Sequence, residues 1–238
     1  MLSRHASGLF DALRAHVPSQ CAVCRAWPSR PVCDGCVARF APPAARCTTC
    51  ALPVASGALQ CADCLREPPP LDRCVTACSY AWPWSACIGD FKFRGEAGWA
   101  RAFATLMRSA PWAEPALEQC DLVLPMPLAA ERLRERGFNQ AHELARRLAP
   151  GRSDPGLLLR VRHTPAQSGL ARAERLRNLQ DAFALEPLRS QEIAGRRIVL
   201  VDDVMTSGAS LFAAARVLRE GGARHITALV IARTEFPH

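Results

Sequence analysis

Four C-x-x-C motifs in the first 70 residues limit what this part of the chain can fold into. The pairs are Cys21/Cys24, Cys33/Cys36, Cys47/Cys50 and Cys61/Cys64. Two thiolates on one tight turn point at the same metal ion, and two such turns complete the tetrahedral four-sulfur set that Zn2+ favours in structural sites. Because this part of the chain has few large apolar residues, we expect metal binding to supply the energy for its folding. The motifs therefore predict two structural zinc ions.

The spacing of these motifs favours a sequential pairing and leaves a crossed pairing open. Eight residues separate the first two motifs and ten separate the last two, which suits a short hairpin in each case. Sequential pairing places one zinc ion among Cys21, Cys24, Cys33 and Cys36, and the second among Cys47, Cys50, Cys61 and Cys64. Redox chemistry is the alternative, but it needs one reactive C-x-x-C motif and not four. The other cysteines lack this spacing and are predicted to be small buried residues: Cys74, Cys78, Cys87 and Cys120.

The composition of the 238 residues is that of a globular protein, with 49% apolar and 22% charged residues. The net charge of +8 indicates anionic partners, although a positive charge also serves solubility. No apolar run approaches the roughly 18–20 residues needed to cross a bilayer. Charged side chains interrupt the segment from Gly8 to Val17, which is therefore predicted to be a short amphipathic helix. We expect a cytoplasmic protein without membrane insertion, and in that compartment a disulfide framework is not expected.

The run Pro68-Pro69-Pro70 marks a change in the character of the sequence. The cysteine motifs precede it, and regular strand and helix patterns follow it. Because consecutive prolines favour an extended connection, this run is a natural linker. We predict a helix and a metal-binding region over residues 1–70, and an α/β domain over residues 71–238.

The α/β assignment depends on the pattern around residue 200. The run 198–201 is apolar throughout, as in a central strand of a parallel sheet with both faces covered. Asp202-Asp203 follows, and a helical pattern begins near Ala209 and stops at Gly221-Gly222. A second apolar strand is predicted over residues 226–231. Ligands of open α/β sheets bind at the carboxyl ends of strands, where the turn between Asp203 and Ala209 lies.

This turn has the chemistry of an anion site, and the acid pair specifies what carries the anion. Thr206, Ser207, Gly208 and Ser210 offer hydroxyls and a compact backbone beside a helix N-terminus. Two carboxylates would repel a bare phosphate, but they can accept hydrogen bonds from sugar hydroxyls or bind Mg2+. A ribose 5-phosphate satisfies both halves. In the alternative reading the aspartates only cap the turn, but capping needs one Asp and not two.

The stretch 198–210 resembles the PRPP-binding motif of type I phosphoribosyltransferases. The chain from Cys21 nearly to its C-terminus resembles the competence-protein ComF family, which joins a double zinc ribbon to such a domain. The resemblance is carried by residues 91–95 (FKFRG), 125–128 (PMPL), 136–141 (RGFNQA) and 164–170 (TPAQSGL), followed by Arg172, Arg175 and Asn178. The RGFNQ and QSGL blocks are more specific to the family than the PRPP motif, which many enzymes share.

The resemblance implies a type I phosphoribosyltransferase-like parallel sheet with flanking helices, and a role for each matching residue. Asp202 and Asp203 would bind the ribose hydroxyls as catalytic residues, with Mg2+ accompanying PRPP. A mobile loop at 163–181 would cover the site, with Arg172, Arg175 and Arg177 neutralising pyrophosphate. The 5-phosphate would lie against Val204, Met205, Thr206, Ser207, Gly208, Ala209 and Ser210, and the pyrophosphate would lie near Pro125, Met126, Pro127 and Lys92.

Two further residues bear on this implied chemistry. Lys92 is the only lysine of the chain, which makes it a candidate for a position that needs a compact ammonium. Purine-salvage enzymes of the superfamily have an acid four positions after the first aspartate, where this chain has Thr206. A purine acceptor is therefore not indicated, and the acceptor stays unidentified.

We therefore predict a PRPP-binding phosphoribosyltransferase of unknown acceptor, linked by the resemblance to DNA uptake or utilisation. The alternative is a zinc-ribbon adaptor in DNA uptake, whose site is regulatory or binds phosphate without transfer. The partners implied are PRPP or a related ribose phosphate, single-stranded DNA, and a helicase of DNA uptake. Against direct DNA contact, the cysteine-rich part has only Trp27 and Phe40 as stacking aromatics, and its arginines are scattered: Arg25, Arg30, Arg39, Arg46 and Arg66.

Overall fold

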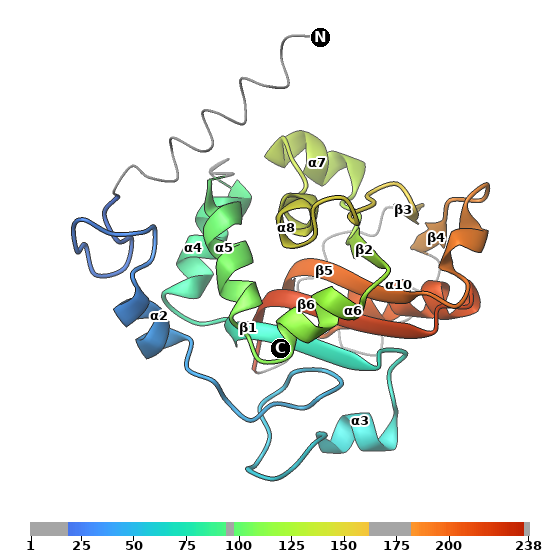
Figure 1. Cartoon of the computed structure of the whole chain (residues 1–238), viewed down its shortest axis with the longest axis horizontal. Coiled ribbons are helices and arrows are strands. Elements are labelled where there is room, and N and C mark those ends of the chain that lie inside the picture. The colour runs from blue at the N-terminus through green and yellow to red at the C-terminus, as the bar shows by residue number, and fades with distance from the viewer. Residues whose placement is uncertain (1–18, 94–97, 162–181, 236–238) are drawn as a thin grey trace.

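A parallel sheet of four strands organises the larger part of the chain (Figure 1). The computed structural model describes residues 19–93, 98–161 and 182–235. The segments predicted as an N-terminal helix and as a mobile loop lie outside the described residues. All neighbouring strands of the sheet are parallel. In spatial order they are β1 (Arg73–Ser79), β6 (His225–Arg233), β5 (Arg197–Met205) and β2 (Leu122–Pro125).

Helices cover both faces of this sheet. Successive side chains of a strand point to opposite faces of the sheet, so the apolar run of β5 contributes side chains to two hydrophobic cores. Val199 and Val201 pack in a cluster with residues of α5 (Trp99–Arg108) and α8 (Gln140–Leu148). Ile198 and Leu200 pack on the other face, in a cluster with α10 (Ala209–Glu220). The prediction of a parallel sheet with flanking helices is therefore confirmed.

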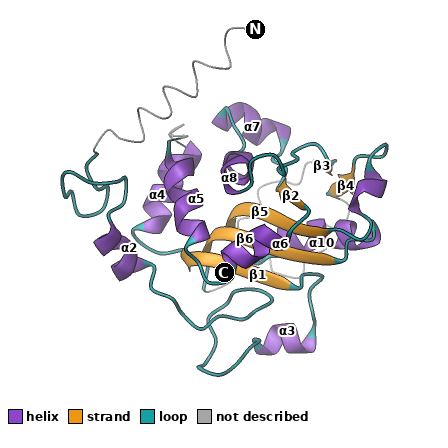
Figure 2. Ribbon diagram, in the orientation of Figure 1, coloured by secondary structure: helices purple, strands orange, loops and turns teal. Residues whose placement is uncertain are grey.

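Shorter elements complete the described structure, as the secondary-structure colouring of Figure 2 shows. In the cysteine-rich part they are α2 (Asp34–Phe40) and α3 (Ala62–Arg66). The helices around the sheet include α4 (Trp84–Phe93), α6 (Ala113–Gln119) and α7 (Ala130–Arg136). An antiparallel pair, β3 (Leu158–Arg160) with β4 (Phe183–Leu185), lies beside a 3-10 turn, η1 (Ser190–Ile193).

Strand β5 extends beyond the apolar run that predicted it. The strand was expected to end before the acid pair, but its pairing with β6 continues to Met205, which lies opposite Arg233. Asp202 and Asp203 are thus held by strand backbone and do not lie in a turn. The helix boundaries near Ala209 and Gly221 are confirmed.

The cysteine-rich part packs against the sheet domain on both of its faces. Cys21 and Cys36 share an apolar cluster with Trp84 of α4, while Cys50 shares the other cluster with Met205 at the end of β5. The domain boundary after residue 70 stays a prediction. The four cysteines outside the motifs are buried, as predicted: Cys74, Cys78, Cys87 and Cys120.

Among the residues that the structure describes, no helix combines the length and the apolar character that crossing a bilayer requires.

Candidate functional site

The acid pair at the carboxyl end of β5 is the centre of the candidate site. Lys92, near the end of α4, places its Nζ 2.7 Å from Oδ1 of Asp203, and both side chains are largely buried. Oδ1 of Asp202 accepts a 2.8 Å hydrogen bond from the backbone N–H of Asp203. Burial and the charge of Asp203 together raise the pKa of Asp202 to about 7. Asp203 thus has a cationic partner. A hydrogen-bond donor or a cation from a ligand would stabilise the charged form of Asp202.

Arginines from two further elements contribute positive charge around these carboxylates. Burial lowers the pKa of Arg136, the last residue of α7, against the opposing attraction of Asp203 and Asp202. The guanidinium of Arg136 lies 5.2 Å from the ring centroid of Phe93 and donates to Oε1 of Gln140 at 3.0 Å. The site therefore has a fixed guanidinium in addition to the ammonium of Lys92.

The second arginine comes from the small antiparallel sheet. Burial, and next the charge of Arg132, lower the pKa of Arg160, while Asp202 opposes both. Its guanidinium lies 5.6 Å from the ring centroid of Phe183. Mutual repulsion among cations that are partly removed from water favours the arrival of an anion.

The turn after β5 has the geometry of an anion-binding helix N-terminus. Gly208 has φ +83, and a Cβ there would lie 2.5 Å from Cε of Met205 and 2.7 Å from Cζ of Phe212. Only glycine fits both this backbone conformation and this space. The first bond of α10 runs from the N–H of Phe212 to the Gly208 carbonyl at 2.8 Å, so the preceding N–H groups have no partner within the helix.

The hydroxyls of the turn differ in exposure. Thr206 is exposed and Ser210 is partly exposed, while Ser207 is buried and its Oγ accepts from the N–H of Ala209 at 3.4 Å. Thr206 and Ser210 therefore offer hydroxyls to a ligand, whereas Ser207 supports the turn itself.

The loop predicted to contact pyrophosphate lies beside the acid pair, because β2 is the neighbour of β5. The N–H of Met126 donates to the carbonyl of Val201 at 2.8 Å, and Met126 accepts at its own carbonyl from Nδ2 of Asn139 at 3.0 Å. Pro125 and Pro127 have no N–H group. These three residues thus shape the edge of the site, and the nearby cations supply its charge.

The RGFNQ block forms the junction between α7 and α8 that holds this loop. Gly137 ends α7 with φ +76, and the ring of Phe138 packs 5.6 Å from that of Phe91. Asn139 caps α8 by accepting from the N–H of Ala141 at 2.9 Å, while its amide donates to Met126. The block therefore aligns α8, the loop after β2 and the guanidinium of Arg136. The candidate pyrophosphate-binding arginines of the segment 163–181, Arg172, Arg175 and Arg177, lie outside the described residues.

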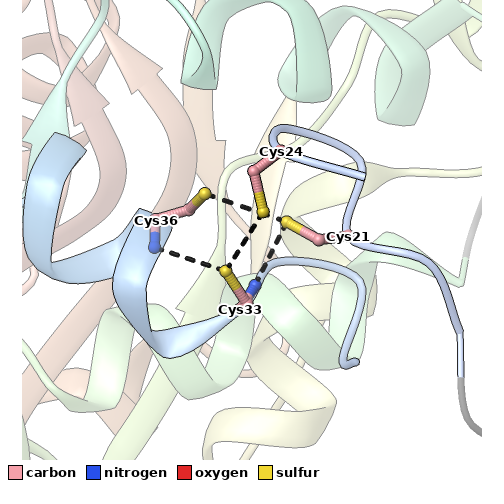
Figure 3. A group of neighbouring side chains, drawn as sticks. All are labelled: Cys21, Cys24, Cys33 and Cys36. Atoms are coloured by element: carbon pink, nitrogen blue, oxygen red, sulfur yellow. Dashed lines mark hydrogen bonds between the residues drawn. The ribbon is translucent and has the colours of Figure 1, made fainter. Parts of the chain in front are cut away.

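The eight motif cysteines form two clusters of four, and within each cluster the sulfurs lie within 4.8 Å of one another. The clusters follow the sequential pairing: Cys21, Cys24, Cys33 and Cys36, then Cys47, Cys50, Cys61 and Cys64. Figure 3 shows the first cluster, where the backbone N–H groups of Cys33 and Cys36 donate to Sγ of Cys21 and Cys33, each at 3.4 Å. Backbone N–H groups that donate to sulfur stabilise the thiolate form of cysteine.

The ionisation of these thiols fits a bound divalent cation. Burial opposes ionisation of Cys21, but the N–H groups of Cys24, Cys33 and Val23 outweigh it and lower its pKa to about 6. Burial and the neighbouring sulfurs raise the pKa of Cys36 to about 12. Four thiolates cannot coexist at this separation without a cation, so each cluster has the donor set of a metal site.

Comparisons with known proteins agree with this geometry. The phosphoribosyl transferase domain family matches residues 133–235. The chain is 32% identical over 227 residues to the DNA utilization protein YhgH of Salmonella typhimurium, covering 92% of this chain and 98% of that protein. It is 34% identical over 193 residues to Competence protein F of Haemophilus influenzae, covering 79% and 84%. Over 135 residues, 36% are identical to Competence protein ComFC of Bacillus subtilis, covering 57% and 53%.

The parallel sheet, the acid pair on β5 and the glycine-capped turn define a phosphoribosyltransferase-like domain. The two four-cysteine clusters add the arrangement of a double zinc ribbon. The chain belongs to the ComF family, as the sequence motifs predicted.

The positions of Arg136 and Arg160 near the acid pair were not predicted from the sequence. Arg136 stands in the RGFNQ block, so a signal was present, but its charge was not assigned to the acid pair. For Arg160 the sequence around it has no pattern that indicates a site, because only the tertiary fold brings β3 close to the acid pair.

Proposed function

We propose that this chain binds PRPP with Mg2+ and transfers its phosphoribosyl group to an acceptor. The observation that carries the proposal is the continuous unit of β5, the acid pair, the Gly208 turn and α10. This unit presents carboxylates and helix N–H groups that have no partner within the helix, in one short stretch. A sugar phosphate needs both kinds of partner, whereas a bare phosphate would be repelled by the carboxylates.

Different residues of the site would bind different parts of PRPP. Asp202 and Asp203 accept hydrogen bonds from the ribose hydroxyls, and the turn 204–210 holds the 5-phosphate against the N-terminus of α10. Lys92 and Arg136 lie where the pyrophosphate would leave, with residues 125–127 shaping that edge. Mg2+ would be held by PRPP and this acid pair, and it would supply charge neutralisation for the phosphates.

In the transfer, the bond between C1 of the ribose and the pyrophosphate oxygen breaks as an acceptor nucleophile bonds to C1. Pyrophosphate leaves with the bonding electron pair, and the acceptor loses a proton. Lys92 and Arg136 stabilise the charge that develops on the leaving group, and the acid pair orients the ribose. Catalysis of this kind depends on positioning and electrostatics, so it needs no protein nucleophile.

We further propose that both cysteine clusters hold structural Zn2+, the ion that favours a tetrahedral set of four thiolates. The names of the relatives connect them to competence and to DNA utilisation, and we extend such a role to this chain in the cytoplasm. Single-stranded DNA and a helicase of DNA uptake are the candidate partners. Two arginines of the cysteine-rich part are paired with carboxylates, Arg30 with Asp34 and Arg66 with Asp63, which favours a docking role for this part over phosphate contact.

Calorimetric titration of the wild type with PRPP and Mg2+ tests the binding proposal. We expect D202N/D203N to weaken binding at least about tenfold, because each hydrogen bond to a charged group contributes roughly 1.5–3 kcal/mol. D34N removes an exposed carboxylate far from β5 in sequence and serves as the control, with affinity retained. Equal affinity of D202N/D203N and the wild type would show that the acid pair is not the ribose site.

Pyrophosphate release separates transfer from regulation. With PRPP, Mg2+ and a panel of amines and bases, a transferase releases pyrophosphate only when a competent acceptor is present. Tight PRPP binding without release for any acceptor would favour the regulatory alternative.

A further inference from the structure

Arg233, the last residue of β6, joins the second cysteine cluster to the phosphate-binding turn. Its side chain is buried in the protein, with 3% of the residue exposed. Its Nε donates to the carbonyl of Cys50 at 2.8 Å. Its Nη1 donates to the carbonyls of Met205, at 3.0 Å, and Thr206. One planar guanidinium therefore holds a carbonyl of the metal-binding turn and the two carbonyls that begin the phosphate-binding turn.

The sheet register places Arg233 in this position. It lies opposite Met205 across the β5–β6 pair, and the N–H of Thr234 donates to the Met205 carbonyl at 3.0 Å. Cys74 of β1 makes a second connection between the same two segments. Its N–H donates to the carbonyl of Thr48 at 2.8 Å, and its Sγ lies 3.5 Å from Sδ of Met205. The turn that carries Cys47 and Cys50 thus contacts the end of β5 by two routes.

The conformation of the metal-binding turn determines where the Cys50 carbonyl points. Ala51, which follows it, has φ +58, a left-handed conformation that is strained for an alanine. The N–H of Ala51 closes the turn onto the Cys47 carbonyl at 2.8 Å. A metal ion shared by Cys47 and Cys50 would hold this strained turn closed, and its loss would free the turn to relax.

We propose that metal binding at the second cluster sets the conformation of the phosphate-binding turn through Arg233, and thereby controls affinity for the 5-phosphate of a ribose phosphate. This inference rests on the proposed function of the turn. The first cluster lies elsewhere in the fold, in the apolar cluster that contains Trp84 at the start of α4. It therefore serves as the internal comparison for the second cluster.

Coupling between two binding sites is reciprocal, so a ligand at the turn must also strengthen metal binding at the second cluster. Typical couplings of this kind are about 5- to 150-fold. Arginine suits this position because the N–H groups of its rigid planar guanidinium can donate to carbonyls on two segments at once. A lysine ammonium is a single point of charge and cannot reach the carbonyls of both segments in this way.

The first measurement uses the zinc-loaded full chain and ribose 5-phosphate as the probe. We expect C61S, which removes a ligand of the second cluster, to weaken ribose 5-phosphate binding about tenfold, and C24S in the first cluster to have a smaller effect. R233K should weaken binding by a similar factor while both zinc ions are retained, as counted by native mass spectrometry. R66K, an exposed arginine of α3 in the same part of the chain, is the matched control and should bind as the wild type does.

The second measurement needs no cysteine variant, so it stays informative if C61S fails to fold. A chelator is mixed with the wild type, and zinc release is followed with and without ribose 5-phosphate. Ribose 5-phosphate should slow release of the second zinc about tenfold in the wild type, and this protection should be lost in R233K.

The outcomes separate the two proposals. If the wild type does not bind ribose 5-phosphate, the proposed function of the turn fails and this inference fails with it. If the wild type binds, but zinc release is unchanged by the ligand or R233K keeps the full protection, the coupling alone is wrong.

Discussion

Lys92 and the acid pair illustrate what single residues contribute to this protein. The only lysine of the chain is a candidate for a position that needs a compact ammonium, and its Nζ lies 2.7 Å from Oδ1 of Asp203. This ion pair leaves Asp202 as the carboxyl with the raised pKa, about 7, because burial and the neighbouring charge both disfavour its ionisation. Asp202 is therefore partly protonated near neutral pH, which residue identity alone does not reveal.

At this scale we predict an unusual pH dependence of stability. Between about pH 4 and pH 7 the folded protein keeps a proton on Asp202 that the unfolded chain has released, so this residue's contribution to the free energy of unfolding falls as pH rises. Without ligand, D202N should therefore be about 1–3 kcal/mol more stable than the wild type at pH 8, and this difference should shrink at pH 5. Urea unfolding at both pH values measures this difference.

The control for that experiment is D154N. A hydrogen bond from Arg189 is the main cause that lowers the pKa of Asp154, so the carboxylate is ionised and stabilising at both pH values. D154N should therefore lose stability at pH 5 and at pH 8 alike. A D202N difference that does not change with pH would contradict the assigned pKa.

At the scale of elements, the unit of strand, turn and helix after residue 197 is built for close packing. β5 is long enough to carry both aspartates, and α10 begins directly after the glycine that closes the turn. The junction of α7 and α8 serves the neighbouring loop in the same way, with Gly137 ending one helix and Asn139 capping the next. Both junctions combine a glycine at positive φ with a helix N-terminus, so small changes there would move the site.

The substitution G208A tests the first of these junctions. We expect it to lower the free energy of unfolding by about 2–4 kcal/mol, because a left-handed alanine is strained and its Cβ would overlap Met205 and Phe212. G57A has a comparable φ of +88 with open space around the added Cβ, so it should cost only about 1 kcal/mol. Denaturant unfolding of both variants measures the difference, and equal costs would show that packing at Gly208 is looser than described.

At the scale of the molecule, the two cysteine clusters extend the two hydrophobic cores. The first cluster adds Cys21 and Cys36 to the core around α4 and α5. The second adds Cys47, Cys50 and Cys64 to the core that contains Met205 and α10. Loss of either metal should therefore destabilise the sheet domain as well as the cysteine-rich part.

The two metal ions should leave at different rates. Cys24 of the first cluster is exposed, whereas three ligands of the second cluster are buried and its fourth, Cys61, is partly buried. We expect a chelator with a colorimetric zinc readout to reveal a fast and a slow phase of release. C24S should remove the fast phase and C61S the slow one. A single phase, or a fast phase that persists in C24S, would contradict this order.

Much of the site was predictable because its chemistry is local in sequence. The C-x-x-C spacing brings two thiols onto one turn whatever surrounds them, and the apolar run with two acids and a small-residue turn specifies a strand, a ligand edge and a helix. Local spacing could not choose between sequential and crossed cysteine pairing. The folded chain places the sulfurs in the sequential groups.

By itself, the sequence determined the strand, turn, helix and strand after residue 197, the four pairs of thiols and the acid pair, because short-range geometry imposes each of them. Only the tertiary structure decided that Lys92 pairs with Asp203, that Arg136 and Arg160 both act on Asp202, and that Arg233 links Cys50 to Thr206. These contacts join segments far apart in the chain. Their partners are chosen by sheet order and register, which no local pattern encodes.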